Sequence, residues 1–265
     1  MLARVRANRP LASLLATGAA ALAIPGLAWA GSGGAGPAPA PPGSPTAGPP
    51  VASGNVPVSA TSGGITLTTN ASAFVRSGLS VTGSVPAGDA GDAVEIDQLG
   101  PTPGSTWTPV ATVHAAPDGS FAASWHTNPA GPLSVRAVVQ GGQASSAAAS
   151  PPSVSVTLYR RSIATLYGPG FYGQRTACGV ILRRRTIGVA NRTLKCGTEV
   201  QVYYNGRVMT VPVIDRGPYA HNANWDLTMA TGRALGMEGT STIGAASLPP
   251  ATSTTPIASG PPAAQ

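Results

Sequence analysis

The stretch VPVIDRGPYAHNANWDL, residues 211–227, decides how the carboxyl-terminal part of this chain is interpreted. An apolar run ends at Asp215, and an Arg-Gly-Pro turn follows, with Tyr219 and Trp225 a few residues further on. A strand end is a rigid support and a turn opens it to solvent, so a carboxylate placed there can meet a substrate. The alternative is that Asp215 only hydrogen-bonds within its own turn, as Asp commonly does.

A β-hairpin is expected immediately before Asp215. The segment Glu199–Tyr204 alternates apolar and polar residues, Asn205-Gly206 is a type I′ turn signal, and residues 207–214 form the returning strand. Pro212 cannot donate to a strand ladder, which indicates an edge or a bulge near Asp215.

Residues 1–30 have the pattern of a signal peptide. Three arginines precede an apolar run at 11–24, and Ala28-Trp29-Ala30 is a small-x-small cleavage site. The run is too short to span a bilayer comfortably, and no cysteine follows it that could carry a lipid anchor. We therefore expect export to the cell wall, the periplasm or the medium, without a stable membrane anchor.

The composition predicts modules separated by spacers, because the 265 residues include 34 glycines and 27 prolines. Residues 31–60 and the tail 248–265 are rich in Gly, Pro, Ala and Ser, and we expect both to be disordered. Residues 61–159 predict short strands between turn signals, as in an immunoglobulin-like β-sandwich. These strands begin near Ile65, Leu79, Ala93, Trp107, Ser120, Leu133 and Ser153. We interpret this module as a spacer or a wall-binding domain, with the spacer favoured.

Cys178 and Cys196 are the two cysteines of the chain, and we expect them to form a disulfide in an oxidising compartment. A metal site is the competing interpretation, but the three histidines, His114, His126 and His221, lack the spacing of metal ligands. No metal and no organic cofactor is expected.

The charge is concentrated in residues 160–247, which carry eleven basic and four acidic side chains. A basic exported module favours anionic partners such as cell-wall polymers or lipid headgroups, and export makes nucleic acid a poor candidate. The run Arg183-Arg184-Arg185 is equally consistent with a solvated loop.

Four blocks carry a family resemblance. They are ATLYGPGFYGQRTACG (164–179), GVANRTLKCGT (188–198), VIDRGPY (213–219) and WDLTMATGRALGM (225–237). Together they resemble the double-psi β-barrel of the RlpA family, septal-ring lytic transglycosylases distantly similar to expansins. The resemblance implies that residues 160–247 form a six-stranded barrel with one or two short helices and a groove for peptidoglycan glycan strands. The residues themselves place one helix between a cap at Thr228 and Gly236.

Family enzymes cleave the bond between N-acetylmuramic acid and N-acetylglucosamine without water and leave a 1,6-anhydro end. Hydrolytic glycosidases use two carboxyl groups, whereas one suffices when the C6 hydroxyl of the sugar is the attacker. Asp215 matches the Asp of the family's DRGP block, so the resemblance implies that it is the general acid/base.

Two positions depart from the family pattern. Asn191 stands where family enzymes carry a His that assists catalysis, and Asn can orient a group but cannot exchange a proton. Val180 and Ile181 occupy the neighbourhood where an acidic residue is common. A non-catalytic, expansin-like glycan binder is therefore the alternative, and a barrel that binds another cell-wall or division protein is a third. We expect a monomer.

The remaining candidates surround Asp215 in the four blocks. The expected catalytic pair is Asp215 with Asn191 as its orienting neighbour. Asp226 is expected to be a helix-start carboxylate with a structural role, and His221 an exposed loop histidine that is less favoured as a substitute for the missing His. The candidates for substrate binding are Tyr167, Gly168, Thr176, Arg216, Tyr219 and Trp225.

Overall fold

The computed structural model describes residues 49–141, 150–219 and 222–250, which all belong to one compact unit beginning at Thr46. The predicted signal peptide lies outside these residues, as do most of the predicted linker and tail. Strands dominate the described part of the chain, and no helix in it is long and apolar enough to cross a membrane.

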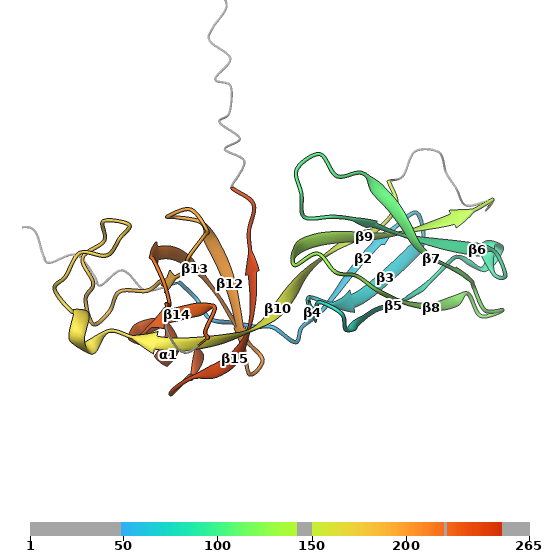
Figure 1. Ribbon diagram of the computed structural model, residues 1–265. Coiled ribbons are helices and arrows are strands. Elements are labelled where there is room, and N and C mark those ends of the chain that lie inside the picture. The colour runs from blue at the N-terminus through green and yellow to red at the C-terminus, as the bar shows by residue number, and fades with distance from the viewer. Residues whose placement is uncertain (1–48, 142–149, 220–221, 251–265) are drawn as a thin grey trace, which may run out of the picture. The chain divides into compact units, whose positions relative to one another are not determined.

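The amino-terminal domain consists of two sheets that pack against one hydrophobic core (Figure 1). One sheet has the order β2-β3-β5-β8, and the other contains β9, β6 and β7 together with β4 and the first half of β10. Their bounds are β2 (Pro57–Ser62), β3 (Ile65–Asn70), β4 (Ser72–Phe74), β5 (Gly78–Ser84), β6 (Ala93–Leu99), β7 (Trp107–His114), β8 (Ser120–His126), β9 (Gly131–Gln140) and β10 (Ser153–Tyr167).

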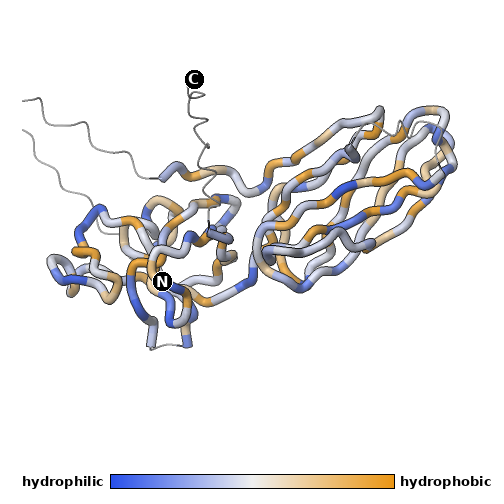
Figure 2. The backbone as a smooth tube through the Cα atoms, turned by 90° about the horizontal axis from the view of Figure 1, so that it is seen from above, coloured by the Kyte–Doolittle hydropathy of each residue, from blue (hydrophilic) through white to orange (hydrophobic). Residues whose placement is uncertain are grey.

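Alternation along the strands explains this packing. In β8, Phe121, Ala123 and Trp125 are buried while the residues between them are exposed, and Val94 and Ile96 of β6 complete the same core. Figure 2 shows the resulting alternation of hydrophobic and hydrophilic positions along the strands. All seven strands predicted in this region are present. The immunoglobulin-like topology stays a prediction.

The predicted linker 31–60 does not extend as far as expected. Strands β1 (Ala52–Ser53) and β2 lie wholly or partly inside it. β2 pairs with β3 along its whole length, and its Val58 and Ala60 pack against the sandwich core. The Pro, Ser and Ala residues of this segment are typical of a linker, but pairing with β3 and packing against the core stabilise a strand here.

A single strand, β10, connects the two domains, so the boundary predicted between residues 159 and 160 lies inside a 15-residue strand. Its first part pairs with β9 and β4 in the sandwich, and its second part pairs with β15 and β14 in the barrel. Tyr159 at the junction is 1% exposed, and its ring centroid lies 6.0 Å from that of Phe74 and 5.4 Å from that of Tyr203.

The carboxyl-terminal domain is a closed barrel of six strands in the order β14-β11-β13-β12-β15-β10, with β10 pairing back to β14. The strands besides β10 are β11 (Val189–Ala190), β12 (Glu199–Tyr204), β13 (Arg207–Asp215), β14 (Trp225–Thr228) and β15 (Ser241–Ser247). The interior is apolar, because Val200, Val202, Val211 and Leu227 are fully buried in one cluster.

The hairpin and the helix that local sequence signals predict are both present. β12 and β13 make the expected hairpin, and Asn205 and Gly206 have φ values of 46° and 77°, as a type I′ turn requires. The helix α1 (Met229–Leu235) begins after Thr228, whose side chain accepts a hydrogen bond from the Thr231 amide, and ends at Gly236 in the left-handed region.

Candidate functional site

Two carboxylates lie on strands that flank the short strand β11. Ala190, its last residue, pairs with Asp215 of β13 on one side and with Asp226 of β14 on the other. The β11–β13 ladder shifts register between Val189 and Ala190, which is the kind of irregularity that Pro212 indicated near this point. Asp215 and Asp226 therefore lie at the same rim of the barrel.

Both carboxylates line one cavity of about 540 Å³, called here the Asp215 cavity. Its rim carries two exposed aromatic side chains, Phe171 with 54% and Tyr219 with 79% of its surface accessible. It is lined by Thr165, Leu166, Tyr167, Gly168, Pro169, Gly170, Phe171, Ala190, Asp215, Arg216, Gly217, Pro218, Tyr219 and Asp226.

The Asp215 carboxylate is held through one of its two oxygens. Oδ1 accepts hydrogen bonds from the backbone amides of Ala177 (2.9 Å) and Arg216 (2.8 Å). Oδ2 accepts none from the part of the chain that the structure describes, and the residue is partly exposed. The geometry leaves one oxygen of a positioned carboxyl group free to exchange a proton with a bound substrate.

The loop that supplies the Ala177 amide is fixed from both sides. Thr176 is 9% exposed, its amide donates to the Val180 carbonyl (2.8 Å), and its Oγ1 accepts from the Val180 amide (3.1 Å). Cys178 forms the predicted disulfide with Cys196. Thr176 does not line the cavity, so its place in the structure is to hold this loop.

Tyr167 ends β10 and lines the Asp215 cavity with its side chain. The residue is 9% exposed, and its Oη makes no hydrogen bond to any of the residues that the structure describes. Burial, and then the nearby charges of Asp215 and Asp226, raise the pKa of this phenol well above its ordinary value of 10.0. The hydroxyl therefore stays protonated at neutral pH and is available as a hydrogen-bond donor.

Asp226 is placed differently from the prediction. It lies inside β14 rather than at the start of the helix, and the capping side chain is that of Thr228. Oδ1 of Asp226 accepts a hydrogen bond from Oγ1 of Thr165 (2.8 Å), and the residue lines the Asp215 cavity. The helix signals that follow Asp226 led to the prediction of a helix start, whereas the residue lies in a strand. Pairing between β11 and β14, which no local pattern revealed, brings it beside Asp215.

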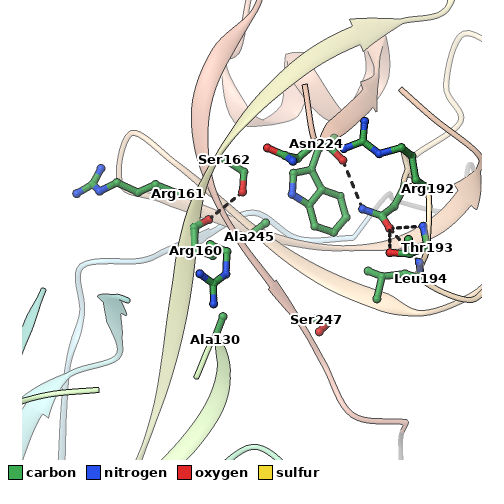
Figure 3. Close-up of a pocket in the computed structure, with 12 residues that line it drawn as sticks. Ala130, Arg160, Arg161, Ser162, Arg192, Thr193, Leu194, Asn224, Ala245 and Ser247 are labelled. Carbon is green, nitrogen blue, oxygen red and sulfur yellow. Dashed lines mark hydrogen bonds between the residues drawn. The ribbon is translucent and has the colours of Figure 1, made fainter. Parts of the chain in front are cut away.

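Asn191 and Trp225 line a second cavity of about 430 Å³ instead, shown in Figure 3. We call it the arginine pocket because Arg160, Arg161 and Arg192 also line it. Oδ1 of Asn191 accepts from the amides of Thr193 (3.0 Å) and Leu194 (2.9 Å), which holds its own turn. Its contact with Asp215 runs through the backbone, from the Asn191 amide to the Asp215 carbonyl (3.1 Å). The catalytic role of Asn191 stays a prediction.

Arg216 and Gly168 line the Asp215 cavity, as does Phe171, which sequence reasoning missed. Nη1 of Arg216 donates to the Asn191 carbonyl (3.4 Å), and the side chain makes no ion pair with Asp215. A Cβ on Gly168 would lie 2.8 Å from Oη of Tyr172 and 2.9 Å from Cγ of Met229, so any larger residue would require these side chains to shift. An aromatic residue within the Gly/Pro-rich turn PGF was the available signal for Phe171.

The candidate histidine and the metal-site alternative remain to be located. His221 lies outside the described residues. Within those residues, no group of three or more His, Cys, Asp or Glu side chains is arranged to hold a metal ion.

One protein-family model matches the barrel. Residues 160–246 match the family described as "Lytic transglycolase". A "Probable endolytic peptidoglycan transglycosylase RlpA" of Aquifex aeolicus is 41% identical over 81 residues, which are 30% of this chain and 36% of that protein. A protein of the same description from Synechocystis is 37% identical over 87 residues, 32% of this chain and 27% of that protein.

Two further matches cover a similar share of the chain. The "Endolytic peptidoglycan transglycosylase RlpA" of Campylobacter jejuni is 35% identical over 89 residues, 33% of this chain and 32% of that protein. Among solved structures, the "Streptomyces papain inhibitor (SPI)" is 25% identical with a TM-score of 0.28, covering 33% of this chain and 92% of that one.

The fold and its matches define the carboxyl-terminal domain as a double-psi β-barrel similar to the family described as "Lytic transglycolase". This domain is RlpA-like. The chain spans about a third of the length of the curated relatives it matches.

Proposed function

We propose that the chain is an exported lytic transglycosylase that cleaves the bond between N-acetylmuramic acid and N-acetylglucosamine in peptidoglycan, with Asp215 as general acid/base. One observation carries the proposal. The free oxygen of Asp215 and the unpartnered hydroxyl of Tyr167 belong to the same cavity, whose rim bears two exposed aromatic rings. The descriptions of the relatives support the choice of substrate.

The reaction needs one proton donor that becomes a proton acceptor. The carboxyl form of Asp215 gives its proton to the leaving O4 as the C1–O4 bond breaks. The C6 hydroxyl of the muramic acid then bonds to C1, and its proton returns to the Asp215 carboxylate. The products are a 1,6-anhydro end and a free 4-hydroxyl, with no water consumed.

Two neighbours assist this step in our proposal. The charge that develops on the sugar ring in the transition state is positive, and a second carboxylate in the cavity, that of Asp226, stabilises it electrostatically. The Tyr167 hydroxyl donates a hydrogen bond to a substrate oxygen, which satisfies a group that is costly to leave unpaired. Phe171 and Tyr219 offer flat apolar faces to the sugar rings.

A non-catalytic glycan binder is the second candidate. The observation that favours it is the Asn191 side chain, which holds its own turn and leaves Asp215 without a second proton-exchanging partner at that position. In either case we propose that the protein acts at the cell wall or in the periplasm, and that the sandwich serves as a spacer.

Incubation of the full chain with purified peptidoglycan, followed by mass spectrometry of the released muropeptides, tests the proposal. We expect 1,6-anhydro products from the natural protein and none from Asp215→Asn. Retention of the natural protein on peptidoglycan without any such product would overturn the enzyme in favour of the binder.

A further inference from the structure

A turn that begins at Asn191 is joined to the strand that carries the proposed acid/base. The backbone amide of Asn191 donates a hydrogen bond to the carbonyl of Asp215 (3.1 Å). Within the turn, Oδ1 of Asn191 accepts from the amides of Thr193 and Leu194. The Asn191 side chain therefore organises the turn, and the backbone bond fixes the turn against Asp215.

The next residue of this turn, Arg192, reaches from it to the rim of the Asp215 cavity. Its Nη1 donates to the carbonyls of Pro218 (2.9 Å) and Ala223 (3.1 Å), two hydrogen bonds that we call the Arg192 clamp. Pro218 and Tyr219 line the cavity, whereas Ala223 is fully buried. A guanidinium carries several donors in a rigid plane, so one side chain can hold two carbonyls at once. The clamp thus ties the rim to a buried point of the chain.

Tyr219 depends on its backbone for its position. Its ring is 79% exposed, and it makes no hydrogen bond or ring contact with the residues that the structure describes. The Pro218 carbonyl that Arg192 holds belongs to the peptide unit leading into Tyr219. Because a peptide unit is planar, fixing this carbonyl also fixes the direction in which the chain enters Tyr219.

We propose that Arg192 is a positioning residue that acts through Tyr219, holding its ring at the rim where a sugar can cover it. This inference rests on the proposed function, because it takes the partner of the ring to be a glycan strand. A side chain that is placed in advance loses less conformational freedom on binding, so the clamp strengthens binding. Asn191 then has a role that needs no proton exchange, since its side chain shapes the turn from which Arg192 extends.

The clamp should serve binding and not the chemical step. Asp215 receives its own hydrogen bonds from the amides of Ala177 and Arg216, neither of which involves Arg192. Loss of the Arg192 side chain also leaves the backbone bond between Asn191 and Asp215 in place. We therefore expect Arg192→Met to raise KM for peptide-free glycan strands while kcat stays unchanged.

A double-mutant cycle tests whether Arg192 acts through Tyr219. The full chain carries Asp215→Asn to prevent turnover, and binding of peptide-free glycan strands is measured. Arg192→Met keeps the aliphatic stem and removes the donors, and it should weaken binding about twofold to tenfold, the value of one aromatic contact. In a chain that also carries Tyr219→Ala, it should have no further effect. Arg185→Met removes the same charge from an exposed position outside both cavities and should change nothing.

A second measurement needs no glycan. In the full chain labelled with 3-fluorotyrosine, the ¹⁹F resonance that disappears in Tyr219→Phe belongs to Tyr219. We expect this resonance to move in Arg192→Met and to keep its position in Arg185→Met. The resonances of the other tyrosines, Tyr159 among the buried ones, should stay in place and so show that the variant is folded.

Three outcomes overturn the proposal. Additive losses in the cycle would mean that Arg192 contacts the glycan itself or acts through another group. A fall in kcat at constant KM would mean that the clamp serves Asp215. An unmoved Tyr219 resonance in folded Arg192→Met would mean that the clamp does not place the ring. Failure of the proposed function is separate, because the natural chain would then neither bind nor cleave glycan strands while the resonance still moved in Arg192→Met.

Discussion

The backbone amide of Ala177 donates a 2.9 Å hydrogen bond to Oδ1 of Asp215, although 38 positions separate the two residues in the chain. The residue after Ala177 is Cys178, which is covalently tied to Cys196. The loop that positions the proposed acid/base is therefore anchored one residue away from its hydrogen bond. This connection between a disulfide and a carboxylate links the stability of the barrel to its proposed chemistry.

Replacing both cysteines by serine tests this link. The disulfide joins residues 18 apart, and closing a loop of this size is worth roughly 3 kcal/mol in the chain-entropy model, so the free energy of unfolding should fall by about that amount. Formation of anhydro products by the folded variant should also fall, because the Ala177 amide is no longer held. Denaturant unfolding and product analysis measure the two effects. Full activity in the folded variant would show that the Thr176–Val180 hydrogen bonds alone hold the loop.

Tyr167→Phe should separate activity from stability. The substitution removes a buried hydroxyl that has no partner, so the free energy of unfolding should stay the same or rise by up to about 2 kcal/mol. Product formation should fall roughly tenfold or more, because a hydrogen bond to the substrate is lost. Tyr204→Phe, at the end of β12 and outside the cavity, is the control for loss of a tyrosine hydroxyl, although this hydroxyl lies 3.5 Å from Oγ of Ser241. Unchanged turnover in Tyr167→Phe would remove Tyr167 from the proposed mechanism.

Alkaline pH should destabilise the protein through its buried tyrosines. Burial raises the pKa of both Tyr167 and Tyr159 above the ordinary value of 10.0. The unfolded chain releases these protons near pH 10.0 while the folded chain retains them, so the stability they contribute is complete below that pH and is lost above it. Unfolding free energies measured from about pH 9 to about pH 11 should show this decline. Tyr167→Phe should make it shallower, and an equal decline in the variant would contradict the assignment.

The local parts of the fold could be predicted from sequence because their signals are local. The Asn205-Gly206 turn, the Thr228 cap and the alternating strands of the sandwich each depend on neighbours within a few residues. The continuity of β10 could not be predicted in this way, since its two halves pair with different sheets and resemble two separate strands.

The candidate site was predictable only in part for the same reason. Asp215 stands out at a strand end, but the register that sets Ala190 between Asp215 and Asp226 depends on pairing between distant strands. The unpartnered hydroxyl of Tyr167 is likewise a property of packing, because the same residue with a neighbouring acceptor would be an ordinary core tyrosine. The Asn191 side chain turns toward Thr193, whereas the family resemblance implied that it orients Asp215.

Tyr219→Ala should weaken glycan binding without affecting the fold. The side chain is 79% exposed, so its removal deletes little packing, and the free energy of unfolding should change by less than about 0.5 kcal/mol. A ring at the rim of the cavity contributes affinity only when a sugar covers it. Retention of peptide-free glycan strands on the immobilised protein measures the effect, with Tyr203→Ala avoided as a control because that ring packs on Phe74. Unaltered retention would place the sugars elsewhere.

Asp226→Asn distinguishes a carboxylate that faces substrate from one that only holds its own strand in place. The amide keeps an oxygen that can accept the hydrogen bond from Thr165, so the strand contact survives while the negative charge is removed. If the charge stabilises the sugar cation in the transition state, anhydro-product formation should fall about tenfold to a hundredfold with little change in the binding of intact strands. A purely structural role would instead lower the free energy of unfolding and leave turnover of the folded protein intact. Parallel measurement of turnover, strand binding and unfolding in this one variant decides between the two roles.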